Sequence, residues 1–276
     1  MRKSRVEEYY DRHARSYTPR GGFSPDDIRN GLYFADQITW HFLKKYAPRR
    51  KSSLTLDAGA GTGDWALLFA KLGYRNMVLA DISQGMLDEA KRKFASLENI
   101  AVSFVKSDIS NLKEFRTGMF DFVFSQYDAV SLCLRPSAAV KALARVAKKG
   151  AHVIAMMDTK FARVPWLIEK GKLNEAVKLL KTNVAWDAWD EWEDQIYPSR
   201  PLTWEELAEY FEQAGLEVVE VIGAEVFTNH IGKSVLNRLK ADPKTRKILL
   251  KMELDHCTNR SLVNMAGHLQ MVGLKN

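Results

Sequence analysis

Apolar and polar positions along residues 53–157 follow two alternating patterns. Short, nearly continuous apolar runs are followed by longer stretches in which apolar residues recur at helical spacing. The runs predict buried strands at 53–57, 76–80, 101–106, 120–125 and 151–157. The longer stretches predict helices at 64–72, 85–97 and 137–148. Because short strands alternate with amphipathic helices, the pattern indicates parallel βαβ units.

The segments on either side of this region have a different pattern. Residues 1–50 are helical in pattern, apart from a turn at 19–22, and residues 160–200 also look helical. Thr203-Trp-Glu-Glu206 fits a capping box that begins another helix, and Gly215 fits its end. The remainder of the chain predicts two more strands, at 216–221 and 268–274. Between them, residues 228–266 predict a mostly helical insertion.

These elements predict a single domain rather than two. Its parts are N-terminal helices (1–50), a core (51–160), a helical insertion (160–200) and a C-terminal part (201–276). No internal repeat or low-complexity segment interrupts it.

Charge and cysteine usage narrow the setting in which the chain works. The chain has 41 Lys and Arg against 34 Asp and Glu, a net charge of +7, and the basic residues are scattered. A solvated surface fits this best, while a surface for nucleic acid or anionic membrane stays open. The two cysteines, Cys133 and Cys257, lack the spacing of a metal site or disulfide framework. With no signal-peptide pattern and no apolar run near the ~20 residues that span a bilayer, we expect a cytoplasmic soluble protein. No cluster of side chains suggests a metal site, so we expect no bound metal.

Three glycines alternate directly after the first predicted strand and before a helix, at Gly59, Gly61 and Gly63. Glycine tolerates unusual backbone angles and lets a ligand approach the main chain closely. The carboxyl end of a first strand is also where doubly wound sheets bind nucleotides. Asp64-Trp65 follows the last glycine, where a phosphate-binding loop needs Lys and then Ser or Thr, so a bound triphosphate is disfavoured.

Acidic residues around this turn bear on the ligand. Asp57 ends the first strand, where it could hold an ammonium group, and Asp81 ends the second, where it could accept hydrogen bonds from ribose hydroxyls. The segment from Gly61 to Ala66 also satisfies the relaxed dinucleotide pattern, so an NAD(P) site stays open. However, Asp57 and Asp64 would put negative charge near a pyrophosphate. S-adenosylmethionine (SAM), which has an ammonium and a sulfonium group but no phosphate, suits these acids better.

The chain resembles a known family at these residues. Asp57-x-Gly-x-Gly-x-Gly63, Asp81 and Ser107-Asp108-Ile109 are similar to the successive motifs of class I SAM-dependent methyltransferases. The resemblance is to the small-molecule type, such as the ubiquinone and menaquinone biosynthesis enzymes. It implies a Rossmann-like α/β fold with a seven-stranded, mostly parallel sheet, helices on both faces and an antiparallel last strand.

The resemblance also implies SAM as cofactor, S-adenosylhomocysteine as product and a set of contacting residues. Gly59, Gly61 and Gly63 would lie against the methionine part, whose amino group Asp57 would orient. Asp81 would hold the ribose, Ile82 would pack on the adenine and Asp108 would meet the adenine amino group. The full implied set is Asp57, Gly59, Ala60, Gly61, Gly63, Asp64, Asp81, Ile82, Met86, Asp108, Ile109, Gln126 and Tyr127. Local roles stay open for Asp64, as an acid in a first helical turn, and for Asp108, as a turn cap.

The acceptor side is less defined. In the family an opening helix often closes over the cofactor, which would make Tyr10 and Tyr17 part of a lid. A base is needed only if the acceptor loses a proton, and the weak candidates for a catalytic role are Tyr10, His13, Tyr17, His41 and Tyr127. Trp186, Trp189 and Trp192 would share one face of a helix, either packed on the domain or lining an apolar acceptor pocket.

The expected function is therefore methyl transfer to a small molecule. Alternatives are a methyltransferase acting on RNA or protein, a catalytically silent SAM-binding scaffold and an NAD(P)-dependent oxidoreductase. Nucleic acid as a partner is disfavoured but not excluded, because the basic residues at 228–266 could contact RNA or simply be solvated. Ser125-Gln-Tyr-Asp128 stands where adenine and glutamine N-methyltransferases carry an Asn-Pro-Pro-Tyr-like tetrad. The oligomeric state is open, with a homodimer among the options.

Overall fold

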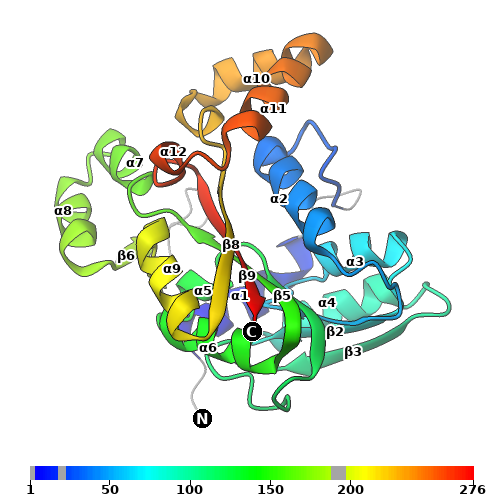
Figure 1. Ribbon diagram of the computed structural model, residues 1–276. Coiled ribbons are helices and arrows are strands. Elements are labelled where there is room, and N and C mark those ends of the chain that lie inside the picture. Colours follow the sequence, from blue (N-terminus) through cyan, green and yellow to red (C-terminus); the bar gives the residue numbers. More distant parts are fainter. Residues whose placement is uncertain (1–3, 18–22, 188–196) are drawn as a thin grey trace.

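The computed structural model describes residues 4–17, 23–187 and 197–276, and its centre is a seven-stranded sheet (Figure 1). The strand order is β3-β2-β1-β4-β5-β9-β8. Strands β1 to β5 pair in parallel, while β9 is antiparallel to both β5 and β8. This confirms the expected Rossmann-like sheet with an antiparallel last strand. The strands are β1 (Leu54–Ala58), β2 (Asn76–Asp81), β3 (Ala101–Lys106), β4 (Phe120–Ser125), β5 (Ala147–Asp158), β8 (Leu216–Ala224) and β9 (His268–Lys275).

Helices cover both faces of the sheet, and each face has its own apolar core. Phe122 and Phe124 of β4 point to the core under α2 (Tyr33–Tyr46) and α3 (Asp64–Lys71). Val123 points to the opposite core, under α6 (Pro136–Val146) and α9 (Trp204–Gln213). The central strands are buried on both sides, which is why they read as continuous apolar runs in the sequence.

The N-terminal helix α1 (Arg5–Tyr17) packs along α4 (Gln84–Phe94), close to the carboxyl end of β2. Asp11 accepts hydrogen bonds from Ser83 Oγ at 2.6 Å and from the Gly85 amide at 3.0 Å. A Cβ added at Gly85 would lie 3.0 Å from the Asp11 carbonyl oxygen, so glycine lets the two helices meet closely. These contacts place α1 over the edge of the sheet where the glycine turn lies.

The remaining helices and short strands lie in the segments that connect or follow the sheet strands. They are α5 (Ala129–Leu132), α7 (Arg163–Glu169), α8 (Leu173–Thr182), β6 (Ala185–Asp187), β7 (Tyr197–Ser199), η1 (Thr228–His230), α10 (Lys233–Ala241), α11 (Pro243–His256) and α12 (Arg260–Val263). The insertion between β8 and β9 is helical, as expected. The capping box of α9 is also confirmed, because Thr203 and Glu206 cap each other's backbone. Within the described ranges, no helix is long and apolar enough to span a membrane.

Two sequence-based expectations differ from the structure. Trp186 lies in β6, which pairs with β7, rather than on a helix, and Trp189 and Trp192 fall outside the described residues. A shared helical face for the three tryptophans is therefore wrong at Trp186, because a non-local strand pairing overrides the helical spacing. The helix expected at 137–148 ends at Val146, and β5 begins at once with a bulged extension.

Candidate active site

The glycine turn between β1 and α3 has three residues in left-handed backbone conformation, Gly59 (φ +76°), Gly61 (φ +53°) and Gly63 (φ +77°). The reasons for glycine differ. A Cβ at Gly59 would lie 2.3 Å from the Ala129 Cβ, and one at Gly63 would lie 2.8 Å from Leu79 Cδ2. At Gly61 nothing lies within 4 Å of the added atom. Gly61 therefore leaves backbone open to an approaching ligand, while the other two glycines allow close packing.

Asp81 ties the end of β2 to this open turn. Its Oδ2 accepts the Gly61 amide at 2.8 Å, and its Oδ1 accepts the Ser83 amide at 2.8 Å. A carboxylate has about four lone-pair sites, so both oxygens can still accept bonds from ligand hydroxyls. Burial raises the pKa of Asp81 to about 6, and the two amides oppose that rise.

Asp57, near the end of β1, is a buried carboxyl group behind the turn. Its Oδ2 has no hydrogen-bond partner among the described residues. Burial raises the pKa of Asp57 well above its ordinary value, and the nearby charge of Asp81 adds to this rise. A buried polar atom without a partner costs free energy, so a cationic group beside Asp57 would be stabilising.

Asp64 and Asp108 have local partners. Asp64 accepts from Thr62 Oγ1 at 2.9 Å and pairs with Lys93 at 2.5 Å. Asp108 accepts the Ser110 amide at 2.8 Å, which caps a turn, and meets Arg135 at 3.3 Å. The two local roles left open by the sequence are therefore present, and a cofactor role for either residue stays a prediction.

The remaining implied cofactor residues differ in exposure. Ala60 and Ile82 are half-buried beside the turn, where a ligand could contact them. Met86 and Ile109 are buried among other apolar side chains. The described geometry thus favours Ala60 and Ile82 as contact residues over Met86.

The chain bends sharply after β4. Tyr127 and Asp128 are consecutive non-glycine residues with positive φ, at 49° and 68°. Such strained residues cluster at functional sites. The bend brings the Tyr127 ring against Trp65 (centroids 6.0 Å apart) and edge-on to His268 (5.2 Å). The Tyr127 hydroxyl donates to the buried carboxyl group of Asp36.

Gln126, directly before the bend, is buried and faces the antiparallel strand β9. Its Oε1 accepts from Gln270 Nε2 at 3.0 Å, while its own Nε2 has no partner among the described residues. The donor group of Gln126 is thus available to a ligand on this side of the sheet.

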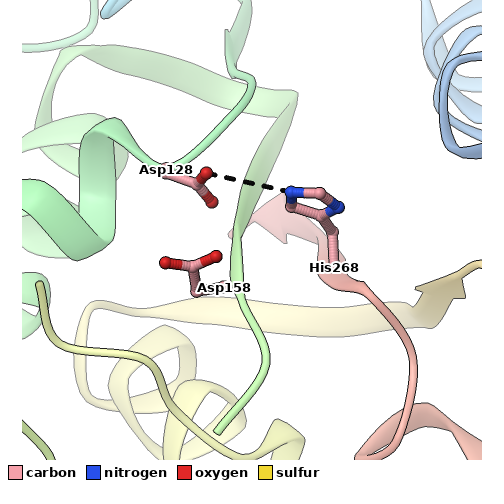
Figure 2. A group of neighbouring side chains, drawn as sticks. All are labelled: Asp128, Asp158 and His268. Atoms are coloured by element: carbon pink, nitrogen blue, oxygen red, sulfur yellow. Dashed lines mark ion pairs between the residues drawn. The ribbon is translucent and has the colours of Figure 1, made fainter. Parts of the chain in front are cut away.

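A polar cluster forms beside this bend (Figure 2). Asp158 ends β5 and His268 begins β9, and the two are paired in register. His268 Nε2 lies 3.8 Å from Asp128 Oδ2, and Arg163 Nη1 lies 3.2 Å from Asp158 Oδ1. Burial raises the pKa of Asp128, and the charge of Asp158 adds to this rise. Burial lowers the pKa of His268. Burial also raises the pKa of Glu225 and of Asp36, each to about 7.

The aromatic residues of α1 reach the same region. Loss of solvation raises the pKa of the Tyr17 hydroxyl, and the charges of Asp128 and Asp64 add to the rise. Tyr17 ends α1 within range of these charges, and about half of its side chain is exposed. Tyr10 supports it from behind, with ring centroids 5.9 Å apart.

The two candidate histidines lie elsewhere. The His13 ring packs on Tyr9 in α1, with centroids 4.6 Å apart. His41 is exposed on α2; partial burial lowers its pKa, and the charges of Lys44 and Lys45 add to the fall. The structure brings Tyr17 and Tyr127 to the site but does not bring His41 there.

Sequence reasoning missed Asp36, Asp158 and His268 as site residues. A usable signal existed for two of them. Asp158 ends the fifth strand and His268 begins an antiparallel last strand, so both must lie at the same edge of the sheet. Asp36 gave no signal, because a single acid in an amphipathic helix is ordinary.

Comparison with known proteins agrees with this geometry. A family model described as a methyltransferase domain matches residues 55–150. A demethylmenaquinone methyltransferase from Staphylococcus aureus is 28% identical over 229 residues, covering 79% of this chain and 91% of its own length. A SAM-dependent methyltransferase from Methanosarcina mazei superposes with a TM-score of 0.60 at 17% identity, covering 85% of this chain and 96% of its own. One from Mesorhizobium loti gives 0.57 at 14% identity, covering 86% and 98%.

The matched segment contains the glycine turn, Asp57, Asp81 and Asp108. The two superposed structures share the fold. Taken with the strand order and the open backbone at Gly61, these findings support a class I SAM-dependent methyltransferase, with the methyltransferase domain matched at residues 55–150.

Proposed function

We propose that the glycine turn, Asp57 and Asp81 hold SAM, and that the chain transfers its methyl group to a small molecule bound beside the bend after β4. The observation that carries this proposal is the open backbone at Gly61, flanked by two carboxyl groups. One of these, Asp57, has a buried oxygen without a partner among the described residues.

The residues present fit SAM in charge and shape. The Asp57 carboxylate would face the ammonium group, and Asp81 would accept the ribose hydroxyls with the lone pairs that the Gly61 and Ser83 amides leave. Ala60 and Ile82, half-buried beside the turn, would contact the adenine. A pyrophosphate would instead meet these acids at short range, which disfavours NAD. When bound, SAM supplies a methyl group on a good leaving group, so the protein's contribution is positioning and water exclusion.

We propose an acceptor with an aromatic or quinoid ring. Trp65 and Tyr127 form an aromatic pair next to the turn. The relative from Staphylococcus aureus is named for demethylmenaquinone, which is a ring of this kind. The Gln126 amide, whose Nε2 lacks a partner among the described residues, could donate to an acceptor oxygen.

The helix α1 would act as the lid over this site. It is attached to α4 through Asp11 and to β3 through the Glu7–Lys106 pair at 2.7 Å. Closing such a lid excludes water from the reacting atoms. We further propose a reducing, cytoplasmic setting, which the unpaired Cys133 and Cys257 support.

The test is transfer of labelled methyl from SAM to a panel of quinols, phenols and amines, with total RNA and a protein mixture as separate samples. A labelled quinol or phenol would support the proposal. Label in RNA or protein alone would overturn the acceptor class. SAM binding with no labelled product in any sample would favour a silent scaffold and contradict methyl transfer.

A further inference from the structure

The cluster beside the bend joins three residues from separate elements. Asp128 follows β4, Asp158 ends β5 and His268 begins β9. One ligand-type atom from each lies within 4.8 Å of the other two. Figure 2 shows the two carboxylates turned toward each other, with the imidazole beside Asp128. The three side chains therefore face one common point from three directions.

The spacing inside this cluster is not that of a hydrogen bond. His268 Nε2 and Asp128 Oδ2 are 3.8 Å apart, beyond the ~3.2 Å reach of an N–H···O bond. Ligand atoms lie about 2.0–2.2 Å from a first-row metal ion, so neighbouring ligands are roughly 3–4 Å apart. The observed separation matches two ligands of one ion better than a direct contact.

Two atoms of the cluster lack partners. Asp128 Oδ1 and His268 Nδ1 are buried, and neither has a hydrogen-bond partner among the described residues. His268 is 7% exposed, so solvent does not replace the missing contact. Because buried polar atoms are normally paired, Asp128 Oδ1 indicates a group that completes the site on the side that His268 Nε2 faces.

The charges around the cluster point the same way. Buried Glu225 lies near His268, so Glu225, Asp128 and Asp158 bring three carboxyl groups into this region. Arg163 pairs with Asp158 Oδ1 at 3.2 Å and offsets one of them. The neutral imidazole of His268 can serve as a metal ligand through a ring nitrogen. A divalent cation between these carboxyl groups would stabilise their ionised forms.

We propose that Asp128, Asp158 and His268 bind one first-row divalent metal ion of the Mn²⁺ type. One imidazole and two carboxylates suit such ions, whereas Ca²⁺ takes six to eight oxygens. The site lies two residues beyond Gln126, on the acceptor side. There the ion would hold an oxygen of the acceptor, and this second role rests on the proposed methyl transfer.

The test is titration of the full-length protein with Mn²⁺ near neutral pH, without SAM. The electron paramagnetic resonance signal of free Mn²⁺ measures how much of the ion stays unbound. The wild type should bind one Mn²⁺ per chain. Asp158→Asn and His268→Gln should each weaken binding at least tenfold, since even residues outside the first ligand shell change metal affinity about 10–100-fold. His230→Gln, which changes an exposed histidine on η1, should bind as the wild type does.

Stability measurements separate metal binding from folding. Asp128→Asn keeps the size of the side chain and removes the repulsion with Asp158, so in chelator it should unfold at or above the wild-type temperature. Added Mn²⁺ should raise the wild-type unfolding temperature and leave that of Asp128→Asn unchanged. No stoichiometric Mn²⁺ binding by the wild type would overturn the site and leave a shared proton as the neutralising group. Equal binding by all variants would also overturn it.

A parallel SAM titration of the same samples keeps the two proposals distinguishable. Mn²⁺ binding without SAM binding would support the metal site and contradict the proposed function. SAM binding without Mn²⁺ binding would contradict the metal site alone.

Discussion

The amide N–H of Gly61 donates to Oδ2 of Asp81 at 2.8 Å, so the open turn of the glycine loop is tied to the end of β2. The same carboxylate caps the start of α4 through the Ser83 amide. Asp81 thus sets the shape of the loop and keeps lone pairs for a ligand. The hydrogen bond between Gly61 and Asp81 therefore makes the glycine turn a preorganised site rather than a flexible turn.

Replacing Asp81 should lower the affinity for SAM more than it lowers the free energy of unfolding. Two hydrogen bonds from ribose hydroxyls to a charged group are worth roughly 3 kcal/mol together, so Asp81→Ala should weaken SAM binding about 100-fold. Calorimetry measures this, and circular dichroism checks the fold. Asp88→Ala, at an exposed position of α4, is the matched control. Unchanged affinity in Asp81→Ala would mean that the ribose lies elsewhere.

The glycines of the turn should separate binding from folding. Gly61→Ala adds a methyl group in open space, so its main cost is the left-handed backbone, about 1–2 kcal/mol, and its main effect should be on SAM affinity. Gly63→Ala would also push against Leu79 Cδ2 at 2.8 Å, so it should lower the free energy of unfolding further. Urea unfolding and SAM titration measure both. Wild-type SAM affinity in Gly61→Ala would show that no ligand approaches this backbone.

SAM affinity should depend on pH through Asp81. Burial raises its pKa to about 6, so near that pH the free protein holds a mixture of carboxyl and carboxylate. The carboxylate offers only acceptor sites, whereas the protonated group gives up one of them to its own O–H donor. SAM affinity should therefore rise as pH increases from 5 to 7 and then level off. Affinity that falls over this range, or does not change, would contradict the assignment.

Asp36 should make the protein less stable as pH rises. Burial raises its pKa from the ordinary 3.8 to about 7, so between these values the folded chain keeps a proton that the unfolded chain has lost. The free energy of unfolding contributed by Asp36 is then highest below about pH 4 and declines toward pH 7. Asp36→Asn should flatten this slope. Urea unfolding across the range tests it, and an unaltered slope in the variant would count against Asp36 as its source.

The attachment of α1 should control access to the site. Asp11→Ala removes the acceptor for Ser83 Oγ and the Gly85 amide, so α1 should open more often. Hydrogen exchange should speed up in residues 5–17, and SAM should dissociate faster. Glu8→Ala, an exposed change on the same helix, should leave both unaltered. Wild-type exchange in Asp11→Ala would show that other contacts hold the lid.

Most of the fold could be predicted from local patterns of apolar and polar residues in the sequence. The strands at 101–106 and 120–125 were predicted with their observed bounds, since buried apolar runs between turns leave few alternatives. β6 was missed because its pairing with β7 joins segments whose relation the sequence does not show. β5 was predicted too short, because its bulged start contains Lys148 and Lys149, which do not look like buried strand.

The cofactor side of the candidate site was predictable because its residues sit in one continuous motif. Asp57, the glycines and Asp81 lie on β1, the following turn and β2. The acceptor side could not be read in the same way. Asp36, Asp158 and His268 come from three distant segments, and only the order of strands in the sheet brings the last two together.

Calorimetric titration of the protein with SAM, S-adenosylhomocysteine and NAD shows whether the glycine turn binds SAM. We expect one site per chain for SAM and for S-adenosylhomocysteine, an affinity about 100-fold weaker in Asp81→Ala, and no measurable binding of NAD. Tight binding of NAD with none of SAM would contradict this expectation.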